Sequence, residues 1–167
     1  MRNSGGIPLS GTKIKGIKEL KKIISRLKSQ GKRIVFTNGC FDILHYGHVK
    51  YLEKAKGLGD CLVVAVNSDA SVKRLKGSHR PIVSQYDRMR IIAGLESVDY
   101  VVLFKEDTPL KIIKILKPDI LVKGSDWNKK SIVGGDFVSS YGGRVVTIQL
   151  TKGRSTTNLI RKIARIF

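Results

Sequence analysis

Short apolar runs alternate with amphipathic segments along most of the chain. Five of these runs are rich in valine, isoleucine and leucine, and the segments between them place apolar residues about every three or four positions. Short apolar runs are typical of strands that are buried on both faces of a parallel sheet. The pattern therefore predicts five buried parallel strands, over residues 33–38, 61–67, 100–104, 119–123 and 144–150.

The amphipathic segments predict helices that connect these strands. Pro109 opens one predicted helix, Pro118 follows its end, and Gly31 lies where another helix is expected to end. Alternating strands and helices indicate a doubly wound, Rossmann-like α/β fold, in which helices flank a five-stranded parallel sheet within a single domain. The predicted helices cover residues 17–30, 48–57, 84–95, 109–117, 131–141 and 155–166.

The order of the strands decides where a ligand binds. In sheets of this kind, ligands bind beyond the carboxyl ends of the strands, at the point where the strand order reverses. We expect the order 3-2-1-4-5, which places the loops after the first and fourth strands, at 38–48 and 123–127, on opposite sides of one crevice. Because the chain has no G-x-G-x-x-G after the first strand and no P-loop, a phosphate must be held in another way.

The N-terminal segment and the cysteines narrow the class of protein. Residues 1–12 contain several glycines and a proline, and we expect a loose leader there, followed by one domain at 13–167 that includes an N-terminal helix. Cys40 and Cys61 form no C-x-x-C or Cys/His cluster, so neither a disulfide framework nor a zinc site is indicated. No run approaches the roughly 18 apolar residues of a membrane span, and no signal peptide is recognisable. These features predict a cytoplasmic protein with no membrane partner.

The chain is strongly basic, with 32 Lys and Arg against 13 Asp and Glu and a net charge of +19. Such a charge raises the hypothesis of a nucleic-acid-binding module. However, no helix-turn-helix, RNP-type or zinc-finger pattern is present, and the lysines of residues 17–28 alternate with apolar positions as on a solvated helix face. Nucleic acid is therefore an unlikely partner, and an anionic small substrate explains part of the charge.

His45 and His48 follow the first predicted strand, at the start of a predicted helix. Positions i and i+3 lie on one side of a helical turn, and Gly47 between them lets a ligand approach the backbone closely. The unpaired N–H groups and partial positive charge of a helix start favour a phosphate. The alternative, that both are ordinary loop and helix residues, stays open for an isolated H-x-G-H pattern.

A second helix start is expected near the end of the sequence. Ser155, Thr156 and Thr157 precede the last apolar pattern, and their hydroxyls can either cap the helix or bind phosphate. Lys123 and Gly124, at the end of the fourth strand, are expected near the crevice because of that position alone.

Two motifs more than 100 residues apart then carry a family resemblance. The run from Thr37 to His48, together with Gly-Arg-Ser-Thr-Thr at 153–157, resembles the nucleotidyltransferase superfamily of cytidylyl- and adenylyltransferases. Further segments are similar to the adenylyltransferase domain of ADP-heptose synthases, with no sugar-kinase sequence present, which suggests a stand-alone version. These segments are residues 64–77, 80–81, 87–89, 106–109 and 121–124.

The resemblance implies transfer of AMP from ATP to D-glycero-β-D-manno-heptose 1-phosphate, with release of pyrophosphate by direct in-line attack. It also implies Mg²⁺ with the ATP, and it suggests a homodimer. By this analogy, His45 and His48 are the catalytic residues. The nucleotide or phosphate is expected to contact Thr37, Asn38, Gly39, Cys40, Phe41, Gly47, Lys123, Gly124, Asp126, Arg154, Ser155, Thr156 and Thr157.

A further group has weaker support as substrate or phosphate contacts: Asp42, Asn67, Asp69, Lys73, Arg74, Arg88 and Trp127. No dedicated metal cage is visible in the sequence, although Asp42 is a candidate magnesium ligand. Lys73, Arg74 and Lys76 form a short basic segment that faces phosphates in the resembled family, but they can equally form a solvated charge run. Arg88 can pair with Asp87 at the surface, and Trp127 can pack at the edge of the core.

Two departures weaken transfer from the cytidylyl branch of the superfamily. Arg154 stands where relatives often have an apolar or small residue, and Leu150 replaces a basic residue of some cytidylyltransferases. Use of CTP with another phosphorylated acceptor, such as glycerol 3-phosphate, still stays an alternative, because the choice of base depends on backbone hydrogen bonds and pocket shape. A basic nucleic-acid-binding module is the alternative from another class.

Overall fold

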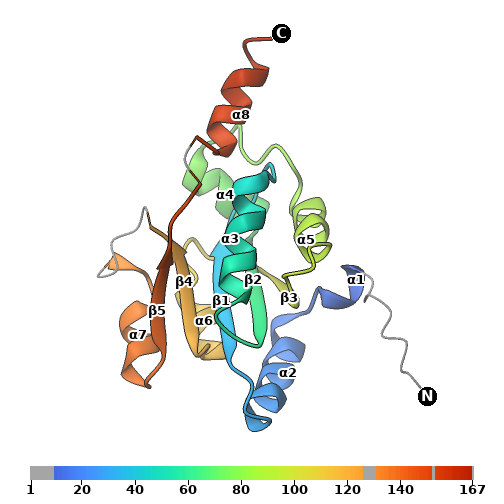
Figure 1. Cartoon of the computed structure of the whole chain (residues 1–167). Coiled ribbons are helices and arrows are strands. Elements are labelled where there is room, and N and C mark those ends of the chain that lie inside the picture. The colour runs from blue at the N-terminus through green and yellow to red at the C-terminus, as the bar shows by residue number, and fades with distance from the viewer. Residues whose placement is uncertain (1–9, 126–130, 152, 167) are drawn as a thin grey trace, which may run out of the picture.

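The computed structural model describes residues 10–125, 131–151 and 153–166. Its five strands form one parallel sheet in the order β3-β2-β1-β4-β5 (Figure 1). This confirms the doubly wound, Rossmann-like fold and the strand order that the sequence predicts. The strands are β1 (Ile34–Gly39), β2 (Cys61–Asn67), β3 (Tyr100–Phe104), β4 (Ile120–Gly124) and β5 (Arg144–Ile148).

Both faces of the central strands are buried, which explains why these strands read as mostly apolar runs, whereas the edge strand β5 is only partly buried. Along β1, Ile34 and Phe36 pack into one core cluster, whereas Val35 between them packs into the other. In the register of the sheet, Ile34 lies opposite Cys61 of β2, and Val35 lies opposite Ile120 of β4. The central strand β1 therefore aligns the carboxyl ends of its two neighbours.

Helices cover the sheet on both sides (Figure 1). α2, α6 and α7 pack over one core cluster, and α3 and α5 pack over the other. The helices are α1 (Ser10–Lys13), α2 (Ile17–Ser29), α3 (Tyr46–Lys56), α4 (Asp69–Lys76), α5 (Gln85–Ala93), α6 (Leu110–Leu116), α7 (Gly135–Ser140) and α8 (Thr156–Ile163).

The structure differs from the sequence prediction in several elements. The helix α4 was not predicted, because its sequence is mostly charged or small and only Ser71 and Val72 are buried. The short helix α1 begins inside the expected leader, and Lys13 at its end is nearly buried, with Nζ donating to the Leu95 carbonyl at 3.0 Å. α7 begins four residues later than expected and β5 ends two residues earlier, at Ile148.

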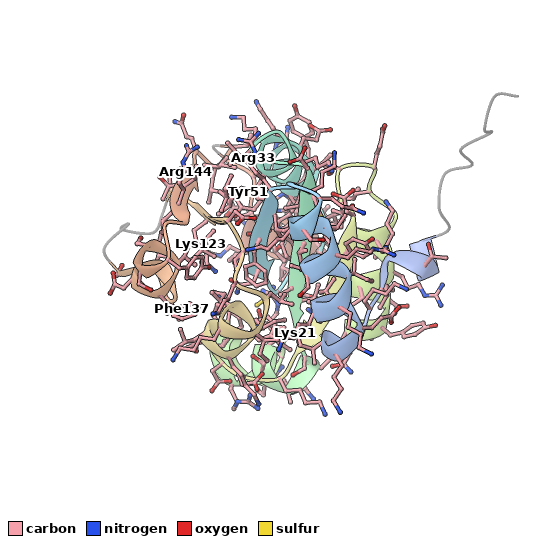
Figure 2. All side chains as sticks on the ribbon, turned by 90° about the horizontal axis from the view of Figure 1, so that it is seen from below. Lys21, Arg33, Tyr51, Lys123, Phe137 and Arg144 are labelled. Carbon is pink, nitrogen blue, oxygen red and sulfur yellow. The ribbon has the colours of Figure 1, made fainter. Side chains whose placement is uncertain are left out.

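The basic side chains lie mainly around the outside of the molecule (Figure 2). A hollow of about 510 Å³ between α2 and α6, away from the carboxyl ends of the strands, is lined by lysines and aliphatic residues. Its lining comprises Lys21, Ile24, Ser25, Lys28, Lys114, Ile115, Leu116 and Lys117. Among the helices that the structure describes, none has the length and apolar character that crossing a membrane requires.

Candidate active site

A cavity of about 660 Å³ opens at the carboxyl ends of the strands. Asn38 near the end of β1 and Lys123 near the end of β4 both line it, and the Lys123 ammonium donates a hydrogen bond to Asn38 Oδ1. β1 and β4 are neighbours in the sheet at the point where the strand order reverses. The first and fourth strand-end loops therefore meet in one crevice, as the fold prediction requires.

The structure brings most of the predicted site residues together around this cavity. Asp126 and Trp127 lie outside the described residues. The predicted residues that line the cavity are Asn38, Gly39, Cys40, Phe41, Asp42, His45, Gly47, His48, Asn67, Lys123, Gly124, Arg154, Ser155, Thr156 and Thr157.

His45 and His48 form a stacked pair at the start of α3. His45 is the residue before the helix, and its backbone N–H donates to Nδ1 of His48 at 3.3 Å. The two ring centroids lie 3.9 Å apart with 22° between the planes. Because Nδ1 of His48 accepts this hydrogen bond, a neutral His48 holds its proton on Nε2, which is then a hydrogen-bond donor.

The environment of the pair favours the neutral form of both imidazoles. Burial, followed by the nearby His45, lowers the pKa of His48 to about 4. Burial and then the Arg154 guanidinium lower the pKa of His45. Nδ1 of His45 is buried and meets no hydrogen-bond partner within the described part of the chain. The pair thus consists of neutral groups near pH 7, one with an unsatisfied polar atom at the cavity.

Gly47 and Phe41 shape the loop around these rings. A Cβ at Gly47 would lie 3.0 Å from the His45 ring and 3.3 Å from the Cβ of Arg154, so only glycine fits there without displacement. Phe41 adopts a left-handed backbone with φ of 47°, and its ring meets that of His48 edge to face, with centroids 5.5 Å apart. Both residues therefore help to hold the histidines in their observed orientation.

The N-terminus of a second helix, α8, reaches the same cavity. Ser155 caps this helix by accepting a hydrogen bond from the Asn158 N–H at 3.1 Å, and Thr156 donates to the Ile43 carbonyl at 3.3 Å. Capping by Ser155, one of the two interpretations of this segment, is therefore observed, and Ser155 also lines the cavity. Two helix N-termini with their partial positive charges converge on one space, an arrangement that suits a polyphosphate.

The model of the cytidylyltransferase-like family matches residues 36–162 of the chain. The chain belongs to this family. It is therefore a nucleotidyltransferase, and the matched segment includes both helix starts, β1 from Phe36 onward and the other four strands of the sheet.

Relatives of this nucleotidyltransferase include proteins named bifunctional protein HldE. The one from Geobacter metallireducens is 56% identical over 158 residues, which are 95% of this chain and 32% of the relative. The one from Nitratiruptor sp. is 58% identical over 150 residues, or 90% of this chain and 32% of the relative. The chain thus spans about a third of the length of these curated relatives.

Solved structures agree with this membership. The lipopolysaccharide core biosynthesis protein from Thermoplasma volcanium is 32% identical with a TM-score of 0.61, covering 74% of this chain and 100% of that protein. Pantoate-beta-alanine ligase from Francisella tularensis, in complex with beta-gamma ATP and beta-alanine, is 16% identical with a TM-score of 0.58, covering 91% of this chain and 78% of the ligase. The second likeness concerns the fold alone.

Thr37 of the nucleotidyltransferase does not lie on the cavity wall, contrary to the sequence prediction. It is fully buried, and its hydroxyl donates to the Val122 carbonyl at 3.0 Å and lies 2.8 Å from the Tyr51 hydroxyl. Thr37 therefore joins β1 to β4 and α3, behind the residues that face the cavity.

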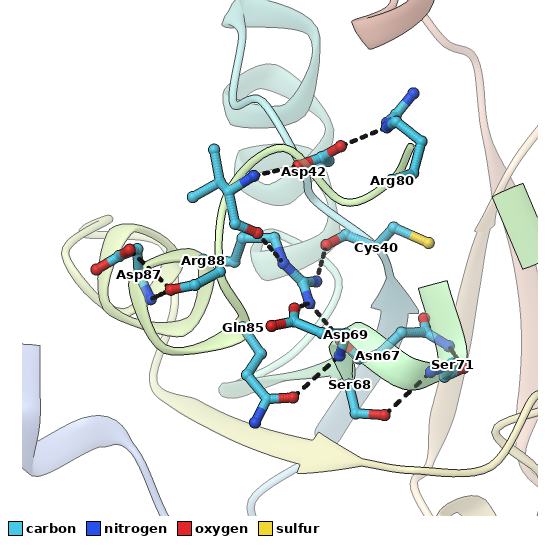
Figure 3. A network of polar contacts seen from close by, with 12 residues as sticks. Cys40, Asp42, Asn67, Ser68, Asp69, Ser71, Arg80, Gln85, Asp87 and Arg88 are labelled. Atoms are coloured by element: carbon cyan, nitrogen blue, oxygen red, sulfur yellow. Dashed lines mark hydrogen bonds and ion pairs between the residues drawn. The ribbon is translucent and has the colours of Figure 1, made fainter. Parts of the chain in front are cut away.

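Arg88 is a buried structural residue, and neither a nucleotide contact nor a surface partner of Asp87 (Figure 3). Its guanidinium is fully enclosed and donates to the carboxylate of Asp69 at 2.7 Å. It also donates to three backbone carbonyls, those of Val83, Cys40 and Asn67. Asp69 is occupied by this contact and, like Arg88, lies outside the cavity wall.

Lys73 and Arg74 are exposed side chains of α4 and do not line the cavity. Arg74 donates to Asp107 Oδ1 at 2.7 Å and to the Lys105 carbonyl at 2.8 Å. Lys73 and Arg74 are therefore better described as part of a solvated charge run than as direct contacts of a phosphate.

Asp42 lines the cavity but does not fit the role of a magnesium ligand. Its carboxylate accepts hydrogen bonds from the N–H groups of Ile82 and Val83, each at 2.8 Å, and from Nε of Arg80. Burial alone would raise the pKa of Asp42, but these donors outweigh burial and lower it. Among the residues described, no group of three or more His, Cys, Asp or Glu is placed to hold a metal ion.

Sequence reasoning missed several residues of the wall. Arg80 follows the unpredicted helix α4, which buries only Ser71 and Val72, so no apolar stripe marked this region. Thr108 and Pro109 follow β3 and share its carboxyl edge, which the strand-end rule could have identified. Lys76, from the predicted basic segment, does line the cavity, and the residues that the prediction did not include are Tyr51, Leu75, Arg80, Asp107, Thr108, Pro109, Val133, Leu150 and Thr151.

Proposed function

We propose that this nucleotidyltransferase transfers AMP from ATP to D-glycero-β-D-manno-heptose 1-phosphate, giving ADP-heptose and pyrophosphate. The observation that supports this most directly is the convergence of two helix N-termini, the stacked histidines and Lys123 on one cavity. The similarity to proteins named HldE, over nearly the whole chain, supports the choice of ATP and a heptose phosphate.

In the proposed reaction, an oxygen of the acceptor phosphate attacks the α-phosphorus of ATP. The bond from that phosphorus to the α–β bridging oxygen breaks, and pyrophosphate leaves with the bond's electron pair. No covalent enzyme intermediate is required, so positioning and stabilisation of charge are the protein's main contributions. Magnesium enters as part of the ATP substrate, bound to its phosphates, because Asp42 is already held by three donors.

Within this proposal, the neutral His48 donates from Nε2 to a phosphate oxygen of the nucleotide. Its orientation is fixed beforehand by the His45 amide, so little reorganisation is needed when charge develops. Lys123 and Arg154 add positive charge at the same cavity. We further propose a homodimer, which sedimentation velocity tests, and a cytoplasmic location, where ATP is available.

The experiment that tests the proposal is a matrix of substrates with Mg²⁺ and pyrophosphate release as the readout. ATP, CTP, GTP and UTP are each combined with heptose 1-phosphate, hexose 1-phosphates and glycerol 3-phosphate. We expect turnover with ATP and heptose 1-phosphate and only background when either is omitted. Preference for CTP with glycerol 3-phosphate would instead support the cytidylyltransferase alternative, and no turnover in any combination would refute the proposed reaction.

A further inference from the structure

Arg80 reaches the cavity from the connection between α4 and α5, held by a buried carboxylate (Figure 3). Its Nε donates to Oδ2 of Asp42, whose side chain is only 1% exposed, while the Arg80 side chain is 18% exposed. The amides of Ile82 and Val83 both bind the other oxygen, Oδ1 of Asp42. One carboxylate therefore fixes both the backbone after Arg80 and the Arg80 guanidinium itself.

This contact uses a single N–H of the guanidinium. An arginine has five N–H donors in a planar fork, so the four on the terminal nitrogens remain for other partners. A guanidinium already held by one carboxylate loses less conformational freedom when it binds a second anion. Arg80 is thus preorganised to bind an anion in the cavity.

The four Lys and Arg side chains that the structure describes on the cavity wall come from separate parts of the chain: Lys76 and Arg80 from the end of α4 and the connection after it, Lys123 from β4, and Arg154 from the segment before α8. Arg154 acts electrostatically on His45, at the two helix starts. Lys76 and Arg80 lie near Cys40 instead: burial raises the pKa of this thiol, and both side chains oppose the rise. A reaction between two phosphate-bearing substrates requires two anion-binding regions. Arg154 at the helix starts supplies one such region, and Lys76 with Arg80 supplies the other.

We propose that Arg80 binds the phosphate of the acceptor substrate, a phosphomonoester, and that Asp42 is the positioning residue that holds Arg80. This rests on the proposed function, since it divides the cavity between an acceptor and a nucleotide. The histidines and the start of α8 then serve the nucleotide phosphates, and the Lys76–Arg80 side serves the acceptor.

Steady-state kinetics on Arg80→Gln tests the proposal, with Arg90→Gln as the matched control. Arg90 is an exposed arginine of α5 that contacts Tyr86. Loss of a charge-assisted hydrogen bond predicts a rise of about tenfold or more in the KM for heptose 1-phosphate. We expect the KM for ATP to stay within about twofold and Arg90→Gln to behave as wild type. An unchanged acceptor KM, or a rise confined to ATP, would overturn the assignment.

A double-mutant cycle tests the role of Asp42. Asp42→Asn is expected to raise the acceptor KM in the wild-type background but to add little in the Arg80→Gln background, because it acts through Arg80. Additive effects in the two backgrounds would contradict a positioning role. If Asp42→Asn does not fold, Arg80→Lys provides the second test: it keeps the charge but loses the fork, and we expect an acceptor KM between those of wild type and Arg80→Gln.

Direct binding separates this inference from the proposed reaction. Heptose 1-phosphate is titrated calorimetrically into enzyme saturated with α,β-methylene ATP, which cannot release pyrophosphate. Weaker acceptor binding by Arg80→Gln than by Arg90→Gln supports the inference. If wild type binds the acceptor but shows no turnover, only the proposed reaction is refuted. Equal binding by the two variants refutes the inference alone, and a wild type that neither binds nor turns over the acceptor refutes both.

Discussion

The backbone N–H of His45 donates to Nδ1 of His48, and the two imidazole rings stack 3.9 Å apart. This one hydrogen bond sets the orientation of His48 and leaves Nε2 as its donor atom. It also ties the geometry of the pair to the backbone at the start of α3, because His45 immediately precedes the first turn of this helix and His48 lies in it. The first predictions concern this arrangement.

Replacement of His48 by alanine removes the proposed phosphate donor. We expect kcat to fall about 100- to 1000-fold, the usual effect of losing one preorganised donor. Circular dichroism and thermal unfolding check that the variant is folded. His79→Ala is the control, since His79 is exposed in the loop after α4, and it is expected to keep wild-type activity. A folded His48→Ala enzyme with near-normal kcat would contradict the role of His48.

Because His48 is buried, we expect its contribution to the stability of the folded protein to depend on pH. Its pKa is about 4 in the folded protein, compared with about 6.5 for an unperturbed histidine. The unfolded chain therefore binds more protons between these values, and the contribution of His48 to stability is fully present above about pH 6.5 and is lost as the pH falls toward 4.

Thermal unfolding of wild type and His48→Asn from pH 7.5 to 4.5 measures this contribution. Asparagine retains an acceptor for the His45 amide but does not titrate. We expect the Tm of wild type to fall more steeply with acidification than that of the variant. Parallel Tm profiles for the two proteins would show that His48 titrates normally in the folded state.

Gly47→Ala tests whether the His45 ring must occupy its observed place. A Cβ there would press on the ring from 3.0 Å, so we expect the ring to shift and kcat/KM to fall at least about tenfold, since small misplacements of catalytic groups are costly. Gly57→Ala, just after the same helix, is the control. A Cβ at Gly57 meets its nearest atom only at 3.5 Å, and the backbone φ of −63° suits alanine. Equal activity of the two variants would argue against the steric requirement.

Arg88→Met tests the buried guanidinium. The change leaves three carbonyl groups and the Asp69 carboxylate, whose side chain is 35% exposed, without this donor, and leaving buried acceptors unsatisfied typically costs about 1 to 3 kcal/mol. We expect the free energy of unfolding in urea to fall by that amount. Arg90→Met on the exposed face of the same helix is expected to change it by less than about 0.5 kcal/mol. Similar losses for the two variants would contradict a structural role for Arg88.

The fold could be predicted because its central strands are buried on both faces. Each run is mostly apolar, and in Cys61–Asn67 every residue is buried, while the strand order places the crevice beside β1 and β4. The helix α4 could not be predicted in the same way, because it buries little beyond Val72 and so has no apolar stripe to recognise.

Contacts between distant polar residues could not be predicted from the pattern. Asp42 and Arg80 lie 38 positions apart, and nothing in the sequence around Asp42 indicates that its carboxylate is occupied by the backbone of another loop. The sequence leaves Arg88 as either a nucleotide contact or a surface partner of Asp87, because arginines are rarely buried. Its burial depends on carbonyl groups from three separate segments, which only the folded chain brings together.

Isotope labelling of the acceptor tests whether the enzyme transfers the nucleotidyl group directly to a sugar phosphate. Heptose 1-phosphate labelled with ¹⁸O at its three non-bridging phosphate oxygens is incubated with ATP, Mg²⁺ and the wild-type enzyme, and the products are analysed by mass spectrometry. Direct attack on the α-phosphorus predicts ADP-heptose that retains all three labels, one of them in the new phosphorus–oxygen–phosphorus bridge, and pyrophosphate without label. Label in the pyrophosphate, or formation of ADP without ADP-heptose, would contradict the claim.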